Sequence, residues 1–132
     1  MRGGEYMKKV ISTKGAPAAI GPYSQGIASE GKFLIISGQL PIDPATGNFP
    51  GEDIASQTEQ SLKNIEAILC EAGYTVEDLV ETTVMLSDIA DFAAMNEVYA
   101  KHFTENCPAR CAFQVAALPR NAKVEIRAVA CK

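Results

Sequence analysis

A chain of 132 residues in which 47% are hydrophobic is long enough for one domain with a modest buried core. The formal net charge is -4 at pH 7, and the 12 basic residues form no block or stripe, which disfavours nucleic acid as a partner. No apolar run reaches the roughly 18 to 20 residues of a membrane span, and we recognise no secretory leader. We therefore expect a cytoplasmic protein without a membrane partner.

The first seven residues, MRGGEYM, contain a second methionine just before a strand-like run. Arg-Gly-Gly-Glu can be encoded by a purine-rich ribosome-binding sequence, so we hypothesise that translation starts at Met7. Residues 1–7 would then be an N-terminal extension, and residues 8–132 a single domain. A mass spectrum of the native protein with Met1 or Arg2 at its terminus would reject this hypothesis.

The first third of the chain predicts three strands. Residues 8–12 are a short strand candidate, followed by the loop GAPAAIGPYSQ, in which Gly and Pro prevent a long helix or strand. Residues 24–30 and 33–40 predict two strands joined by a turn, and the second is apolar enough for a central strand. The segment PIDPATGNFPGED that follows is rich in turn residues.

Two segments have apolar residues at helical spacing. The first predicts a helix over residues 54–72, with Asp53 as its N-cap and Gly73 as its C-cap. The second predicts a helix over about residues 91–104, which Pro108 prevents from continuing.

Three further strands are predicted in the second half of the chain. Residues 79–88 alternate with the period of two that is typical of a strand. Residues 111–117 and 123–131 predict two strands joined by LPRNAK, a link so short that we expect an antiparallel return.

This order of elements predicts an α+β domain with a mixed six-stranded sheet and both helices on one face. Two helices cannot cover both faces of such a sheet. The strands are nevertheless apolar on both sides, so we expect another subunit to bury the second face. The residues that indicate this are Leu34, Ile36, Met85 and Val129.

The cysteines include no CxxC pair, and without a secretory signal they are expected to be free thiols in a reducing cytosol. They are Cys70, Cys107, Cys111 and Cys131. Zinc binding by His102, Cys107 and Cys111 would need a fourth ligand, and their spacing matches no standard finger. We therefore expect no metal.

Arg110 stands at the start of one predicted strand and Glu125 inside the last, at positions where the apolar pattern does not require a charged residue. One interpretation is that they form a structural or interfacial ion pair. The other is a site for a small anion, because a guanidinium can hold a carboxylate by two parallel hydrogen bonds and a nearby glutamate can transfer a proton. The sequence pattern alone leaves both open.

Three other polar features have a structural and a functional interpretation. Tyr23 is either a turn aromatic or a ligand contact within its loop. Ser37 and Gly38, in SGQLP, either end a strand or expose backbone N–H and C=O groups to a ligand. His102, alone on the second helix, is expected to be a surface residue and not a base.

Six segments, in this order, resemble the Rid family (reactive intermediate deaminase, YjgF/YER057c/L-PSP). They are GAPAAIGPYSQG, ISGQLPIDPATG, QTEQSLKNIEAIL, DFAAMNEVYAKHF, PARCAFQVAALP and KVEIRAVA. The resemblance covers about residues 8–131, and so many ordered motifs are a far stronger signal than any single one. Residues 8–132 are accordingly expected to be one Rid-like domain.

The resemblance implies a chorismate-mutase-like α+β subunit and a homotrimer whose sheets form a central barrel, with ligand clefts between subunits. Family members that keep the arginine hydrolyse enamine and imine acids, such as 2-aminoacrylate, 2-iminobutanoate and 2-iminopropanoate, to 2-oxo acids and ammonia. Pyridoxal-phosphate dehydratases release these compounds, and the hydrolysis uses no cofactor. The implied small-molecule partners are therefore imines, enamines or 2-oxo acids.

The resemblance also assigns site residues, which fall on Tyr23, Ser37, Gly38, Asn96, Arg110 and Glu125. It implies that Arg110 binds the substrate carboxylate and that Tyr23 packs beside the ligand. The backbone of Ser37 and Gly38 would contact the imine end, and Glu125 would orient or deprotonate the attacking water. Asn96 matches a family asparagine near the cleft, without an assigned role.

The chain departs from many relatives two residues after the arginine, where Ala112 replaces a cysteine. Cys111 stands one position early, and strand alternation predicts that it faces away from Arg110. We therefore expect water, Glu125 and backbone groups to suffice, since a protonated imine is already a strong electrophile.

Other functions are weighed against the deaminase. A non-catalytic protein that binds 2-oxo acids or related carboxylates would use the same cleft without turnover. A ribonuclease or translation inhibitor is disfavoured by the acidic pI of about 5.0 and by the absence of a histidine-based cleavage pair. A chorismate mutase is suggested by the fold alone, which does not establish chemistry.

Overall fold

The structure is a computed structural model that describes residues 8–132. The predicted extension of residues 1–7, and with it the proposed start at Met7, lies outside the described residues. The elements are β1 (Lys8–Ile11), β2 (Gly26–Ser29), β3 (Phe33–Gln39), α1 (Ile54–Ala72), β4 (Leu79–Leu86), α2 (Phe92–His102), β5 (Ala109–Gln114) and β6 (Val124–Cys131). The α+β class is confirmed.

The predicted strands form two sheets and not one. A four-stranded sheet has the order β3-β6-β4-β5, in which β4 and β5 are parallel and the other pairs are antiparallel. Among residues 8–132, the strands β1 and β2 pair only with each other, and one bridge between Ser24 and Ala109 joins this hairpin to β5. Pro22 and Pro108 lack an N–H group, so the ladder cannot extend upstream of that bridge.

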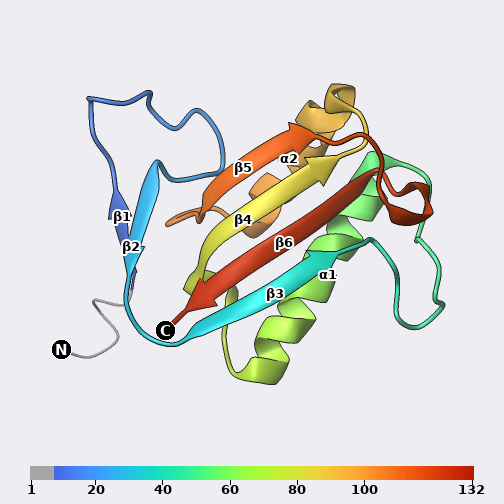
Figure 1. Cartoon of the computed structure of the whole chain (residues 1–132), viewed down its shortest axis with the longest axis horizontal. Helices are drawn as coiled ribbons and strands as arrows, with labels where there is room; N and C mark the ends of the chain where they lie inside the picture. The colour runs from blue at the N-terminus through green and yellow to red at the C-terminus, as the bar shows by residue number, and fades with distance from the viewer. Residues whose placement is uncertain (1–7) are drawn as a thin grey trace.

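The strands β5 and β6 run antiparallel, as expected, but they are not neighbours, because β4 lies between them (Figure 1). Residues 115–123 are enough to step over β4, since adjacent strands lie only about 4.8 Å apart. In addition, β5 begins at Ala109 and not at residue 111, because its ladder with β4 starts where Glu81 faces Ala109. Arg110 therefore lies inside the strand.

The helix α1 has the predicted bounds and the predicted caps. The Asp53 side chain accepts a hydrogen bond from the Ser56 N–H at 2.9 Å, which satisfies one of the free donors of the first turn. Gly73 has the left-handed φ of 81° that ends many helices, and its N–H donates to Cys70 O. The second helix, α2, is two residues shorter at its end than predicted.

Both helices cover the same face of the four-stranded sheet, and the core lies between them and the strands (Figure 1). The largest fully buried apolar side chains include Tyr99, Ile36, Leu62, Ile65, Leu69, Leu79, Leu86, Met95 and Ile126. The helices also bring Asn96 and Tyr99, both on α2, to the side of β5.

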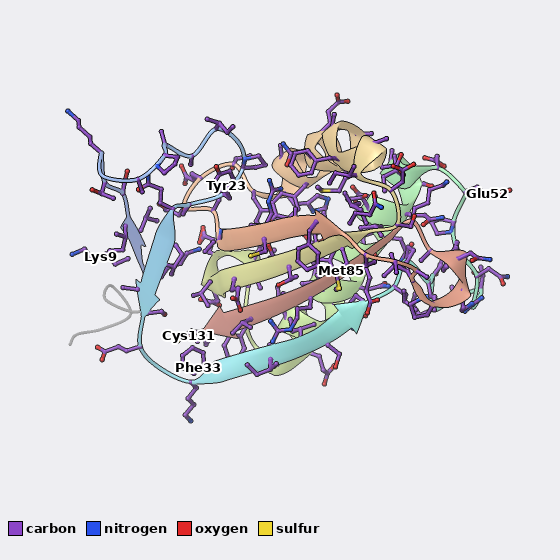
Figure 2. The ribbon with its side chains drawn as sticks, turned by 45° about the horizontal axis from the view of Figure 1, so that its top comes forward. Lys9, Tyr23, Phe33, Glu52, Met85 and Cys131 are labelled. Atoms are coloured by element: carbon purple, nitrogen blue, oxygen red, sulfur yellow. The ribbon has the colours of Figure 1, made fainter. Side chains whose placement is uncertain are left out.

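The other side of the sheet, which we call the open face, is exposed and partly apolar. Phe33 is 61% exposed, Ile35 62% and Phe113 44%. Figure 2 shows Met85 on this side, away from the helices. An apolar sheet face that is left in water is typical of a subunit interface, so burial by another subunit stays our prediction. Within residues 8–132, no helix is long and apolar enough to cross a membrane.

Candidate active site

The guanidinium of Arg110 lies at the edge of the sheet, between β5 and α2. In the ladder of β4 with β5, Arg110 faces Thr82, which is fully buried on the helix side of the sheet. Arg110 Nη1 donates a hydrogen bond to Asn96 Oδ1 at 2.7 Å. The guanidinium carbon lies 4.7 Å from the ring centroid of Tyr99 and 5.6 Å from those of Tyr23 and Phe92. Three aromatic faces therefore surround the cation.

This cation is half-buried and has no carboxylate partner among residues 8–132, where the ion pairs involve His102 and Arg127 instead. Burial lowers the pKa of Arg110, while Tyr99 and Tyr23 act in the opposite direction. A guanidinium nevertheless stays charged in proteins. Removing a charge from water is costly without a partner of opposite sign, so the site favours an anion.

The loop that carries Tyr23 is held by the side chain of Gln25. Gln25 Oε1 accepts a hydrogen bond from the Thr13 N–H at 2.6 Å, and Nε2 donates to Pro17 O at 2.7 Å. The Tyr23 N–H donates to Gly21 O at 2.8 Å, which tightens the turn. These bonds replace the secondary structure that Gly and Pro exclude, and they hold the Tyr23 ring near Arg110.

Glu125 lies on the open face, where it faces Met85 in the ladder of β4 with β6. A Cβ atom built on Gly38 would collide with Oε2 of Glu125, so the carboxylate packs directly on the glycine backbone. Ser37, the residue before Gly38, is exposed. Among the described residues, the Glu125 carboxylate forms no ion pair.

The six residues that the sequence suggested therefore fall into two groups on opposite faces of the sheet. Tyr23, Asn96 and Arg110 lie together, on the helix side. Ser37, Gly38 and Glu125 lie together on the open face. Alternation along the strands separates the two groups, because Arg110 is in register with Thr82 and Glu125 with Met85. Of the interpretations left open by the sequence, an ion pair between Arg110 and Glu125 within one chain is therefore excluded, whereas a pair across an interface is not tested by a single chain.

Sequence reasoning missed three residues around Arg110: Thr82, Phe92 and Tyr99. In the sequence, Phe92 and Tyr99 are apolar residues of the helix predicted over residues 91–104, a pattern that by itself indicates core positions. Together with Asn96 they have the spacing i, i+4, i+7, which places them on one face of a helix. That spacing was the signal that could have found them. Thr82 lies beside Arg110 because of the register between β4 and β5, and a local sequence pattern does not reveal that register.

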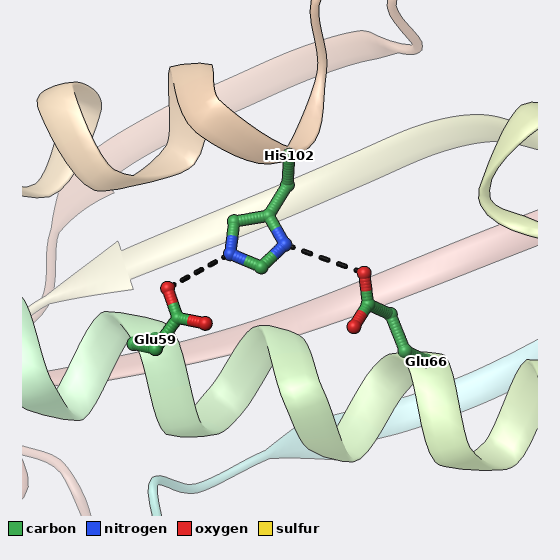
Figure 3. A network of polar contacts seen from close by, with 3 residues as sticks. All are labelled: Glu59, Glu66 and His102. Carbon is green, nitrogen blue, oxygen red and sulfur yellow. Dashed lines mark hydrogen bonds and ion pairs between the residues drawn. The ribbon is translucent and has the colours of Figure 1, made fainter.

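His102 is not a surface residue, contrary to expectation. Its side chain is only 12% exposed and lies between two glutamates of α1 (Figure 3). Nε2 is 2.9 Å from Glu59 Oε1, and Nδ1 is 3.3 Å from Glu66 Oε2. The two carboxylates lie on opposite sides of the ring, so they join α2 to α1.

The cysteines do not form a second site. All four are free, and no group of three or more His, Cys, Asp or Glu side chains within residues 8–132 is arranged to hold a metal ion. Cys111 is in register with Thr83 and is exposed on the open face, away from Arg110, as alternation predicted. Burial raises the pKa of the Cys107 thiol, although Lys8 opposes this, so Cys107 is not activated as a nucleophile either.

Comparison with known proteins shows to which family this chain belongs. A family model described as "Endoribonuclease L-PSP" matches residues 13–132. The chain belongs to this L-PSP family. The resemblance to Rid, YjgF and L-PSP proteins is thereby confirmed.

Three proteins that are similar to this L-PSP family chain match it over almost their whole length. A RutC family protein from Pyrococcus horikoshii is 54% identical, over 96% of this chain and 99% of its own. The 2-iminobutanoate/2-iminopropanoate deaminase of Escherichia coli is 49% identical, over 94% and 98%. The crystal structure of E. coli TdcF with bound serine matches with a TM-score of 0.73 and 44% identity, over 94% of this chain and 98% of that one.

Proposed function

We propose that this chain is a deaminase that hydrolyses 2-imino acids, and the enamines with which they interconvert, to 2-oxo acids and ammonia. The observation that carries the proposal is the half-buried Arg110 guanidinium, which has aromatic and amide contacts but no carboxylate partner within residues 8–132. The relative in E. coli that is named 2-iminobutanoate/2-iminopropanoate deaminase, 49% identical over 94% of this chain, supports it.

The proposed role of Arg110 is to hold the substrate carboxylate. A guanidinium has five N–H donors, and the described residues occupy only one nitrogen, Nη1, through Asn96. The edge formed by Nε and Nη2 stays available for two parallel hydrogen bonds to a carboxylate. Asn96 then orients the guanidinium, and Tyr23 provides an apolar wall beside the bound acid.

The proposed role of Glu125 is to transfer protons. Glu125 accepts a proton from a water molecule, whose oxygen bonds to the carbon of the protonated imine while the C=N π electrons move to nitrogen. The proton then passes from Glu125 to nitrogen and the C–N bond breaks, so that ammonia leaves. The hydroxyl oxygen forms the C=O bond and gives its own proton to the Glu125 carboxylate, which passes it to the departing ammonia or to water. The exposed Ser37 and the Gly38 backbone are suited to hydrogen-bond the nitrogen end. The hydrolysis needs only water and proton transfer.

We further propose that the site is completed by a second copy of the chain, in a homotrimer. Arg110 and Glu125 lie on opposite faces of one subunit, so they can act on one substrate only if they come from different subunits. The exposed apolar residues of the open face support such an interface. A cytoplasmic location is also proposed, because all four cysteines are free.

Removing the guanidinium tests the proposed reaction. We expect Arg110→Ala to lower kcat/KM for 2-iminobutanoate by about two to three decades. This estimate follows from the loss of one buried charged contact, which costs roughly 2 to 5 kcal/mol. The substrate is generated in the assay by a threonine dehydratase, and release of the 2-oxo acid is followed. Arg120→Ala is the matched control, because Arg120 is bound to Gly47 O at 3.1 Å in an exposed loop. Unchanged activity in Arg110→Ala would refute the proposal.

A non-catalytic carboxylate binder is the second candidate, since E. coli TdcF was solved with bound serine, a small carboxylate. The two candidates differ in what Glu125 contributes. If the chain is a deaminase, Glu125→Gln abolishes turnover while 2-oxobutanoate still binds. If it is only a binder, the parent protein shows no hydrolysis above the rate in water.

A further inference from the structure

The ring of Tyr99 lies against the guanidinium of Arg110, and the hydroxyl of the same Tyr99 is hydrogen-bonded to the sheet. Of the three rings around Arg110, that of Tyr99 is nearest, at 4.7 Å from the guanidinium carbon to the centroid. Tyr99 Oη and Thr82 Oγ1 share a hydrogen bond of 2.7 Å, and both residues are fully buried. Thr82 is the residue of β4 that faces Arg110 in the ladder. The three side chains therefore meet in one place.

This arrangement restricts the guanidinium in two ways. The planar group packs on aromatic surface, so the Tyr99 ring limits the tilt of its plane. Asn96 binds Nη1 and limits the rotation within that plane. Both Asn96 and Tyr99 come from α2, whereas Thr82 comes from the sheet, so helix and sheet are both needed to set the position of the guanidinium.

The Tyr99 hydroxyl does not itself take part in proton transfer. It is fully buried and engaged with Thr82, and burial raises the pKa of Tyr99 to about 12 despite that hydrogen bond. The phenol therefore stays neutral throughout the physiological pH range. Its hydrogen bond serves to fix the ring.

We infer that Tyr99 and Thr82 are positioning residues for Arg110, which set the plane in which the guanidinium meets the carboxylate of its ligand. This inference rests on the proposed function in one respect, the carboxylate bound by Arg110. It adds two residues that touch neither substrate nor reacting atoms, and it predicts that their loss weakens carboxylate binding beyond any loss of stability.

The first experiment compares Tyr99→Leu with Phe103→Leu. The ring of Phe103 packs on that of Tyr99 at 4.4 Å between centroids, and it is not among the three rings over which the Arg110 guanidinium lies. Phe103→Leu therefore disturbs the same core without removing an aromatic ring from the guanidinium. Binding of 2-oxobutanoate to the full-length protein is measured by isothermal titration calorimetry. We expect Kd to rise about tenfold in Tyr99→Leu, given the usual strength of cation–π contacts, and less than twofold in Phe103→Leu. Both variants should melt at a lower temperature.

The second experiment changes Thr82, so that the inference can be decided even if Tyr99→Leu does not fold. Thr82→Val keeps the shape but leaves the Tyr99 hydroxyl without its partner, and we expect Kd for 2-oxobutanoate to rise about threefold to tenfold. Thr82→Ser keeps the hydroxyl and should restore the parent Kd. If the role of Thr82 were purely structural, Kd for 2-oxobutanoate would stay at the parent value in both Thr82→Val and Thr82→Ser, and only the melting temperature would fall.

The outcomes separate this inference from the proposed function. If Arg110→Ala loses 2-oxobutanoate binding while Tyr99→Leu and Thr82→Val keep the parent Kd, the positioning role is wrong and the carboxylate site stands. Equal weakening in Tyr99→Leu and Phe103→Leu also overturns the positioning role. If Arg110→Ala itself binds as tightly as the parent, the carboxylate site is wrong, and the positioning role fails with it.

Discussion

At the scale of single residues, the site depends on two close contacts, one around the Arg110 guanidinium and one between Glu125 and Gly38, and each requires particular side chains. Arg110 can be half-buried without a carboxylate because aromatic rings and one amide oxygen replace part of its hydration. Glu125 can lie on the backbone of β3 because Gly38 has no Cβ. The second of these is directly testable.

We expect Gly38→Ala to displace the Glu125 carboxylate and to lower kcat/KM for 2-iminobutanoate by at least about tenfold. The new methyl group would meet the flexible end of Glu125, so the side chain moves and the backbone does not, and stability should fall by only about 1 kcal/mol. Steady-state kinetics and thermal melting measure the two effects. Gly26→Ala is the control, because its Cβ would be 3.6 Å from Ile11, an ordinary contact. Parent-like kinetics in Gly38→Ala would show that Glu125 is not needed where it lies.

At the scale of elements, α2 is the part of the chain that organises Arg110. It carries Phe92, Asn96 and Tyr99 on the face toward β5, and it ends at His102, which binds α1 through Glu59 and Glu66 (Figure 3). Its position on the sheet therefore depends on a polar contact as well as on the core.

We expect His102→Ala to lower the free energy of unfolding by about 1 to 2 kcal/mol, since hydrogen bonds to two carboxylates are lost. Urea denaturation provides the measurement. A double-mutant cycle with Glu59→Gln should show that the two changes are not additive, because they remove the same contact. Additive effects would mean that the contact between His102 and Glu59 contributes nothing. Parent-like kcat/KM is expected, since the core still holds Tyr99 in place.

At the scale of the whole molecule, the two groups of site residues lie on opposite faces of one sheet, which the proposed homotrimer would reunite between neighbours. The open face is apolar where such a neighbour would pack, with Phe33 and Ile35 among its most exposed residues. A monomer would hold two incomplete half-sites.

Mixed oligomers test the shared site. We co-express Arg110→Ala and Glu125→Gln chains with different tags and purify the assemblies that carry both tags. Each variant alone should be inactive, whereas a mixed trimer has one intact Arg110 next to one intact Glu125, which restores about a third of the sites. Analytical ultracentrifugation should give a mass of three chains. Inactive mixed assemblies, or a monomeric mass, would contradict the shared site.

The elements were predictable from sequence because their causes are local. The bounds of α1 follow from apolar spacing and from the caps Asp53 and Gly73, which act within one turn. The strand β4 follows from its alternation, and the α+β class from the order of elements. The family resemblance implied that Arg110 binds the substrate carboxylate. In the structure, its guanidinium has no carboxylate partner among the described residues, which is consistent with that role.

The tertiary structure alone decided which of these elements meet. The position of β4 between β5 and β6 depends on pairing between strands that are far apart in the sequence. The length of the link, residues 115–123, limits only how far apart β5 and β6 can be. This pairing placed Thr82 opposite Arg110 and Met85 opposite Glu125. Composition and local spacing therefore determined the elements and supplied the charged side chains, whereas the register of the sheet determined that Arg110 and Glu125 lie on opposite faces.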